Sequence, residues 1–267
     1  MSKISDTFIH KVKKHPDRFY IIHYSCQNLY DKNEGLSPRI TSIAVNHFLS
    51  DQTLSFSTHA IAEELGIVRE EVQAEFDRVE RMLLQQFYDF VRDRRQAHWI
   101  HWNMRNLTYG FEHLEHRYRK LTGQNPPSIP IEQRINLSDM IGDRYGSRYA
   151  DNPKLRSLME MNGGVHRHFL TGEEEVEAFE KGEFIRMHNS TLAKVGFFHR
   201  VLDKFLKNRL RTKSRTFGAR LDRLFESRTA KVLAVAASAI AIVFAPLQLW
   251  SFFSPNNDAA ISASDKS

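Results

Sequence analysis

Apolar and polar positions in the first hundred residues follow a pattern that predicts strands of a β-sheet. The run FYIIHYSCQNL (19–29) is aromatic and β-branched, and RITSIAVNHF (39–48) follows it after a polar loop. A third run, TLSFST (53–58), comes after the turn-like sequence Ser50-Asp51-Gln52. We expect these runs to form three antiparallel strands, and AHWIHW (97–102) to form a short fourth strand.

Helical spacing of apolar residues predicts most of the remaining elements. Between 69 and 95 apolar residues recur at three- and four-residue intervals, which is typical of an amphipathic helix. Further helices are expected from about Leu107 to Leu121, at 137–145, 153–162 and 173–181, and from near Ser190 towards Leu210. The expected fold class is therefore α/β (α+β), with a mixed sheet of about four to five strands covered by helices over residues 1–203.

A different pattern begins after residue 203. The segment 232–253, VLAVAASAIAIVFAPLQLWSFF, is apolar on all sides and has no formal charge. About 20 apolar residues cross a hydrocarbon core of roughly 30 Å, so one C-terminal transmembrane helix is predicted. The tail that follows, 254–267, is polar and expected to be disordered. Small residues in the apolar segment allow two copies to pack closely as a homo-oligomer: Ala234, Ala236, Ala237 and Ser238.

The distribution of charge orients this segment. The formal net charge is +6, but residues 1–203 hold 27 basic against 28 acidic side chains, whereas residues 204–231 hold 10 basic against two acidic ones. The positive excess therefore lies beside the apolar segment, which favours contact with a membrane over contact with nucleic acid. We predict a single-pass membrane protein with a cytoplasmic N-terminal body. Residues 204–231 are expected to form a basic helix that rests on anionic lipid, with a plain solvated connector as the alternative.

The runs quoted above, with two later ones, resemble the ribonuclease-H-like fold of DEDD-type 3′–5′ exonucleases. FYIIHYSCQNL and RITSIAV resemble the first two strands of that family, and AHWIHWNMRNLTYGFEHLEHRYRKL resembles its next strand, His-Asn turn and helix. KLRSLMEMNG and MHNSTLAKVGFFHRVL resemble its late helices. The similarity covers roughly residues 19–207 and implies a mixed sheet covered by helices. It also implies a nuclease site in which carboxylates hold two Mg²⁺ ions.

The carboxylates of that family are missing at the matching positions. The Asp-x-Glu of the first strand is replaced by residues drawn from the tetrapeptide His23-Tyr24-Ser25-Cys26. The second Asp falls near Asn106 or Leu107, and the last one falls on Ala193 beside Lys194, whose charge repels a metal ion. The sequence therefore predicts no metal site and no cofactor, and Mg²⁺ or Mn²⁺ would be required only if the body were a nuclease with an atypical site.

Candidate catalytic residues are His23, Cys26 and His188. His23 and Cys26 have a spacing that allows a base and a nucleophile, although a lone cysteine more often packs as a small apolar residue. His188 is the His of the His-x-x-x-x-Asp helix that the resemblance indicates. An atypical site would bring His23 and His188 together with Asn103.

Candidate ligand-binding residues lie in HWIHWNMRNLTYGF. Aromatic and polar side chains alternate there, which suits a rim that stacks a base or nucleotide: Trp99, Trp102, Asn103, Arg105, Asn106 and Tyr109. The alternative is a core strand followed by a turn in which Asn106 caps the next helix. In the helix that follows, His113 and His116 stand beside Glu112 and Glu115, which favours a solvated helix face.

Three functions remain open at this point. The first is a membrane-tethered, non-catalytic body that binds a nucleotide, nucleic acid or partner protein. The second is a nuclease or nucleotide-processing enzyme with an atypical site. The third is a helix-turn-helix DNA-binding regulator, because STHAIAEELGIVREEVQAEFDRVERM (57–82) has the required spacing, although its second helix carries more acidic than basic residues.

Overall fold

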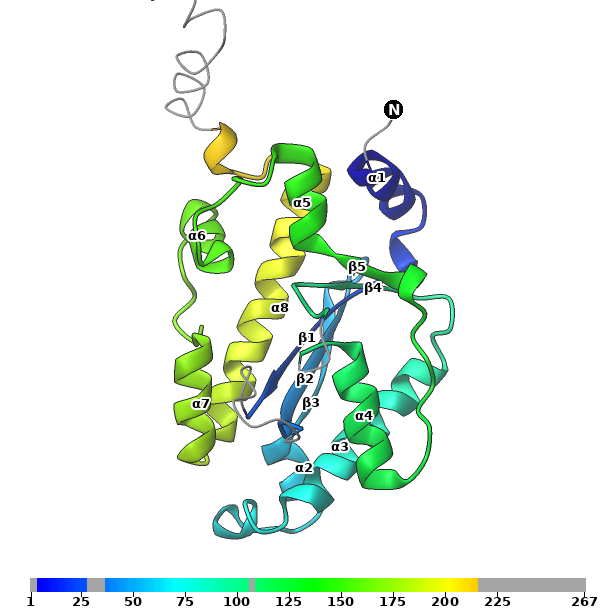
Figure 1. Ribbon diagram of the computed structural model, residues 1–267, viewed down its shortest axis with the longest axis vertical. Coiled ribbons are helices and arrows are strands. Elements are labelled where there is room, and N and C mark those ends of the chain that lie inside the picture. Colours follow the sequence, from blue (N-terminus) through cyan, green and yellow to red (C-terminus); the bar gives the residue numbers. More distant parts are fainter. Residues whose placement is uncertain (1–3, 28–36, 106–108, 216–267) are drawn as a thin grey trace, which may run out of the picture. The chain divides into compact units, whose positions relative to one another are not determined.

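Five strands form one mixed sheet in the order β3-β2-β1-β4-β5 (Figure 1). They are β1 (Phe19–Cys26), β2 (Ile40–His47), β3 (Gln52–Ser57), β4 (His98–His101) and β5 (Arg134–Asn136). β2 pairs antiparallel with β1 and β3, whereas β4 pairs parallel with β1 and β5. Only β2 therefore runs against the other strands. This computed structural model describes residues 4–27, 37–105 and 109–215.

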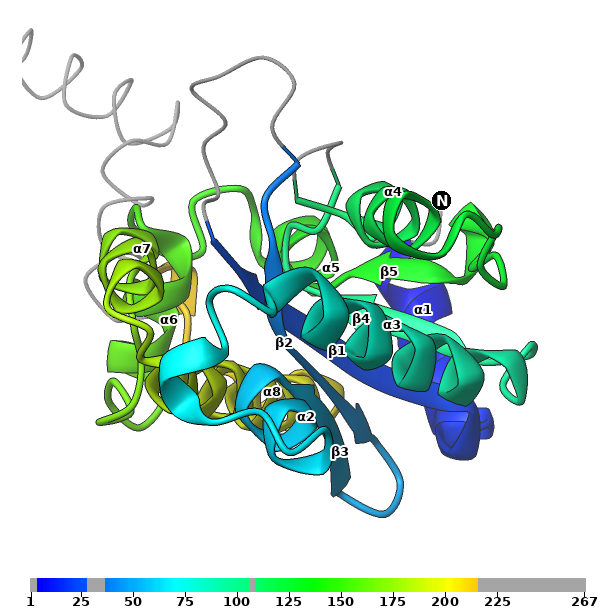
Figure 2. The same ribbon diagram turned by 90° about the horizontal axis from the view of Figure 1, so that it is seen from below.

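Helices cover both faces of the sheet. In the described ranges they are α1 (Ile4–Lys14), α2 (Thr58–Glu64), α3 (Phe76–Arg92), α4 (Phe111–Thr122), α5 (Leu137–Tyr145), α6 (Lys154–Met161), α7 (Gly172–Glu180) and α8 (Phe184–Leu206). α3 and α4 lie on one face, and α8 lies on the other with α1 and α5 (Figure 2). The body built by these elements extends to Ser214.

β1 lies at the centre of the sheet and is buried on both faces. Ile22 and Tyr24 enter the core under α3 and α4, whereas Phe19 and Ile21 enter the core under α8. A strand that is covered on both sides needs apolar residues on both sides, so its sequence is a nearly continuous apolar run. This explains why the run from Phe19 is easy to recognise as a strand although it does not alternate.

The predicted α/β class is confirmed, as are the three antiparallel strands and the short strand after residue 97. Two elements were not predicted. β5 has only three residues, too few for a periodic pattern, and is held by parallel pairing of Ile135 with Ile100 of β4. α1 is a short basic helix at the N-terminus, anchored by the buried side chains of Phe8 and Val12.

Several predicted helices begin at other residues than expected, and α4 begins at Phe111 instead of about Leu107. The helix expected from residue 69 begins only at Phe76, because 69–71 form a separate 3₁₀ turn. The connection from Glu64 to Phe76 is much longer than the three or four residues of a helix-turn-helix, and α3 packs its apolar face against the sheet. The last helix begins at Phe184 instead of Ser190, because Ser190 and Thr191 bond within the body and do not cap a helix end.

The described part of the predicted basic helix at 204–231 does not form a separate helix. α8 ends at Leu206. Asn208 has a φ of 56°, a left-handed conformation that is incompatible with a continuing α-helix. The chain then packs on the body: the Asn162 side chain bonds both backbone groups of Arg211, and the Lys213 amide donates to the Tyr149 carbonyl. Residues 204–214 thus belong to the body.

The remaining C-terminal predictions lie outside the described residues. They are the rest of the basic segment, the transmembrane helix at 232–253 with its small-residue packing face, and the tail at 254–267. Within the described ranges, no helix combines the length and apolar character that a membrane span requires.

Candidate functional site

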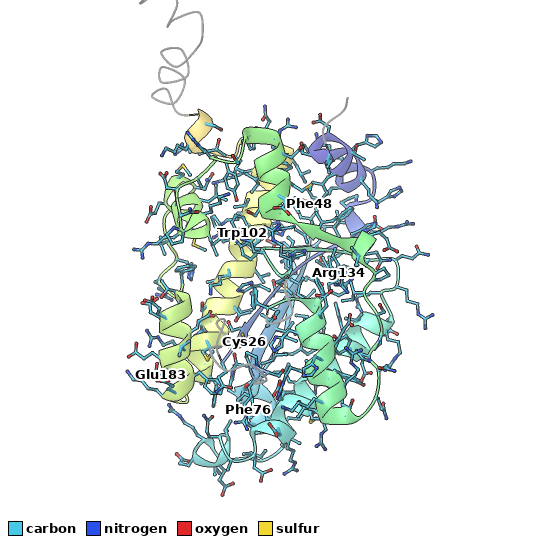
Figure 3. All side chains as sticks on the ribbon, viewed as in Figure 1. Cys26, Phe48, Phe76, Trp102, Arg134 and Glu183 are labelled. Atoms are coloured by element: carbon cyan, nitrogen blue, oxygen red, sulfur yellow. The ribbon has the colours of Figure 1, made fainter. Side chains whose placement is uncertain are left out.

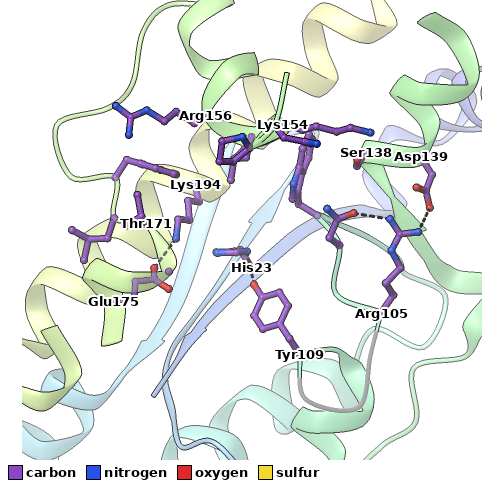
Figure 4. A pocket seen from close by; sticks show the side chains of 18 of the residues that line it. His23, Arg105, Tyr109, Ser138, Asp139, Lys154, Arg156, Thr171, Glu175 and Lys194 are labelled. Atoms are coloured by element: carbon purple, nitrogen blue, oxygen red, sulfur yellow. Dashed lines mark hydrogen bonds and ion pairs between the residues drawn. The ribbon is translucent and has the colours of Figure 1, made fainter. Parts of the chain in front are cut away.

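A cavity of about 1030 Å³ lies at the carboxyl edge of the parallel strands (Figure 4). β1 pairs with β4 only as far as Ile21, so His23 stands beyond the paired region and faces the cavity. Trp102 and Asn103 directly follow β4, and Ser138 stands just after β5. Three segments far apart in the sequence meet because parallel strands end at one edge, where open α/β sheets bind their ligands.

Helices α6, α7 and α8 form the opposite wall. α6 contributes Lys154 and Arg156 from its first turn, which has no acidic residue. α7 contributes Thr171, whose side chain caps the helix, and the buried Glu175. The N-terminal end of an α-helix has a positive partial charge, so the α6 end and its two basic side chains favour an anion.

A buried ion pair joins α7 to α8 in this wall. Nζ of Lys194 lies 2.6 Å from Oε1 of Glu175, and both side chains are less than a tenth exposed. The same carboxylate oxygen accepts bonds from the hydroxyls of Ser25 on β1, at 3.0 Å, and Ser190 on α8, at 3.1 Å. The pair is therefore fixed by three elements, yet it still lines the cavity (Figure 4).

His23 is buried at the base of the cavity. Its Nδ1 lies 3.0 Å from the hydroxyl oxygen of Tyr109, and its ring packs edge-on against Phe198 of α8. Burial, reinforced by the nearby ammonium of Lys194, lowers the pKa of His23 well below its ordinary value. Burial also raises the pKa of the Tyr109 phenol. Both groups are thus neutral at pH 7.

A hydrogen-bonded rim holds Arg105 at the mouth of the cavity. Its guanidinium donates to Oδ2 of Asp139 at 3.0 Å and to Oδ1 of Asn103 at 2.9 Å. The Asn136 side chain bonds the same two residues, so four side chains form one network. Asn103 takes part from a left-handed backbone conformation, with φ of 54°. The guanidinium is half exposed and has further N–H groups, so it is held ready for an acceptor.

The structure brings some predicted site residues together and separates others. His23, Trp102, Asn103 and Arg105 all line the cavity. Trp99 points to the other face of the sheet and is packed against Tyr20, Phe87 and Phe90, so it cannot reach a ligand in the cavity. Trp102 stacks on Phe198 and is 6% exposed, so only a small part of its side chain lines the cavity. Asn106 lies outside the described residues.

Cys26 does not meet His23. The two residues are three positions apart on one strand, so their side chains lie on opposite faces of the sheet. Cys26 is buried with Phe76 in the core under α3 and α4 (Figure 3). A base and a nucleophile on opposite faces cannot act on one another, which excludes the predicted pairing.

His188 also lies away from the cavity. Its Nδ1 is 2.9 Å from the Ser42 hydroxyl, its Nε2 is 3.5 Å from that of Ser55, and its ring is next to His59. These contacts bind α8 to β2, β3 and α2. Burial, with the neighbouring His59, lowers the pKa of His188 to about 4. The expected convergence of His23, Asn103 and His188 is therefore limited to the first two.

His113 is not on a solvated helix face. It is 1% exposed, and its ring nitrogens contact the Tyr24 hydroxyl at 3.0 Å and the Pro38 carbonyl at 2.9 Å. Glu112 and Glu115 both bind Arg134. In the described part of the chain no three His, Cys, Asp or Glu side chains cluster closely enough to hold a metal ion.

Sequence reasoning missed the cavity wall that α6, α7 and α8 form. It treated Lys194 only as a charge that repels metal, and it did not single out Glu175, Ser138 or Asp139. One signal was present, because Lys194 lies on an apolar helix face, between Thr191 and Phe198, where a charge needs a buried partner. Nothing in the sequence indicates that this partner is Glu175, 19 positions earlier.

Comparison of the chain with protein-family models, with curated proteins and with solved structures gave no match.

Proposed function

We propose that the body is a ribonuclease-H-like domain that binds the phosphate of a nucleotide or nucleic-acid end in this cavity and does not catalyse metal-dependent hydrolysis. The sheet supports the fold, since the elements have the order on which the resemblance rests and only β2 is antiparallel to the others. The observation that carries the binding proposal is the buried Lys194 ammonium at the cavity wall.

Metal catalysis does not fit the residues at this edge. Alternation along β1 puts His23 and Ser25 on the cavity side, so these two take the positions of the Asp-x-Glu pair. A hydroxyl and a neutral imidazole supply no negative charge for two divalent cations, and Lys194 adds a positive one. Glu175 is already saturated on one oxygen by three donors.

The lining suits a phosphorylated nucleotide. Arg105 stands on one side of the cavity, and Arg156 and Lys194 stand on the other (Figure 4). Lys154 also lines the cavity, with its ammonium over the Tyr149 ring. Guanidinium and ammonium groups are the usual partners of phosphate in proteins. Phe169 adds an aromatic surface against which a base can stack. The cavity volume is also in the range of sites for ligands of this size.

Titration of the full-length chain, purified in detergent, tests the proposal. Fluorescently labelled AMP and a 5′-phosphorylated oligonucleotide are expected to bind saturably and to compete, whereas adenosine competes weakly. Arg156→Ala is expected to weaken binding, and Arg92→Ala, which is outside the cavity, serves as the matched control. Absence of saturable binding by either probe would refute the binding function.

The enzyme alternative is decided with the same preparation. Labelled single-stranded DNA and RNA are incubated with Mg²⁺ or Mn²⁺ and the products are separated. We expect no turnover above that of protein-free buffer. Metal-dependent turnover that is lost in His23→Ala would favour an atypical nuclease instead.

We further propose that the apolar segment 232–253 anchors this domain in a membrane, with the basic residues beside it on the cytoplasmic side. The support is the sequence: 22 residues without a formal charge follow a stretch with 10 basic side chains. Full-length protein is expected to stay in the membrane pellet after carbonate extraction, and a chain that ends at residue 231 is expected to be released. Extraction of the full-length chain by carbonate would contradict the anchor.

A further inference from the structure

The environment of Lys194 differs from that of an ordinary buried lysine. Its ammonium bonds Glu175 at 2.6 Å and lies 5.2 Å from the centre of the Phe169 ring. It also lines the cavity of about 1030 Å³, together with Glu175. An ammonium has three N–H donors, and one carboxylate oxygen satisfies only one of them. The group is therefore able to bond a second acceptor that enters the cavity.

The position of this ammonium is set in advance. Oε1 of Glu175 is held by Ser25 and Ser190 as well as by Lys194, so α7, β1 and α8 all contribute to its placement. Ser25 is itself fixed by the Thr191 hydroxyl at 2.7 Å. A flexible side chain that is already ordered loses little conformational entropy when a ligand binds.

A second buried ion pair in the same chain shows what a structural pair looks like. Arg117 bonds both oxygens of Glu80, and each partner also bonds backbone: Glu80 accepts from the Ile40 amide and Arg117 donates to the Ser37 carbonyl. Neither residue lines the cavity. The Glu80–Arg117 pair thus tethers the segment that leads into β2, whereas the Glu175–Lys194 pair lines the cavity.

We propose that Lys194, held by Glu175, is a fixed cation built into the protein that bonds the ligand's phosphate directly, so that binding needs no divalent metal. The proposal deepens the function stated above and rests on it. Glu175 both positions the ammonium and competes with the phosphate for it. Removing one partner or the other must therefore change phosphate affinity in opposite directions.

Isothermal titration of the full-length protein with inorganic phosphate and with AMP tests this, in buffer with excess EDTA and in buffer with Mg²⁺. The wild type is expected to bind equally in both buffers. Lys194→Met is expected to lose about tenfold or more in affinity, the value of a charge-assisted hydrogen bond. Glu175→Gln removes the competing charge and is expected to bind phosphate several-fold more tightly.

A purely structural pair gives a different result. Both single variants then lose stability and affinity together, and Arg117→Met weakens phosphate binding as much as Lys194→Met does. Loss of binding in EDTA also overturns the proposal. The double variant Glu175→Gln/Lys194→Met leaves no unpaired buried charge, so it tests affinity in a folded protein if a single variant does not fold.

The two proposals fail in distinguishable ways. If AMP does not bind the wild type but inorganic phosphate binds and Lys194→Met abolishes this, the nucleotide function is wrong and the fixed cation stands. If AMP binds and Lys194→Met binds it equally well, the fixed cation is wrong and the nucleotide function stands. If neither probe binds, both are wrong.

Discussion

The hydroxyl of Tyr109 lies 3.0 Å from Nδ1 of His23 and also donates to the carbonyl oxygen of Tyr24 at 3.1 Å. A hydroxyl has a single hydrogen, so Nδ1 of His23 must be the donor in the first bond. His23 is neutral because burial lowers its pKa, which leaves Nε2 without a proton. The cavity therefore presents a hydrogen-bond acceptor at His23 near the Lys194 cation.

Tyr109→Phe is expected to destabilise the protein by about 1–3 kcal/mol, because it leaves the buried Nδ1–H of His23 and the Tyr24 carbonyl without their partner. Urea unfolding measures the change. Tyr145→Phe, at an exposed hydroxyl that bonds Asn208, is the matched control and is expected to have a small effect. Equal effects of the two substitutions would contradict the buried bond.

Arg105→Lys is expected to weaken AMP binding several-fold although the charge is kept. The guanidinium bonds Asn103 and Asp139 through two different nitrogens, and a lysine ammonium cannot reproduce that fork. Competition with labelled AMP at two salt concentrations measures the effect. Arg92→Ala again serves as the control, and an unchanged affinity in Arg105→Lys would show that the rim does not touch the ligand.

His113 is expected to make stability depend on pH. Burial lowers its pKa to about 4 from an ordinary value of 6.5, so between these values the unfolded chain binds a proton that the folded protein does not. The free energy of unfolding therefore falls as pH falls, by about 1.4 kcal/mol per unit for this residue.

His113→Gln removes this titration. The slope of the unfolding free energy against pH is expected to fall by about 1.4 kcal/mol per unit, the contribution of one proton. Urea unfolding of both proteins between pH 4 and 7 measures it. Buried His101, with a pKa of about 3, contributes its own slope in both proteins. Parallel stability curves for the two proteins would show that His113 does not titrate as described.

Arg117→Met is expected to cost about 3–5 kcal/mol of stability, because it leaves the buried carboxylate of Glu80 without its cation. Burial already raises the pKa of Glu80 in the intact pair. Glu80→Gln/Arg117→Met is expected to recover part of the loss in urea unfolding. Arg92→Ala breaks only an exposed pair with Asp89 and should not change stability measurably. A loss of stability in Arg117→Met no larger than that in Arg92→Ala would contradict the buried pair.

Several local features were predictable because their cause is local. The run from Phe19 to Cys26 forms a strand since aromatic and β-branched side chains suit a pleated, buried surface. α4 stops where predicted, because Gly123 adopts the left-handed conformation, with φ of 73°, that ends a helix. The concentration of basic residues after residue 203 can be read from the sequence alone.

Tertiary structure alone decided which side chains meet. Cys26 and His188 looked as promising as His23, but the sheet turns Cys26 to its other face and α8 carries His188 towards β2 and β3. Lys194 finds Glu175 only because α7 packs beside α8 on the strand that carries Ser25. Sequence patterns report the periodicity of single elements, whereas a site depends on how distant elements cross and register, which packing of the whole core determines.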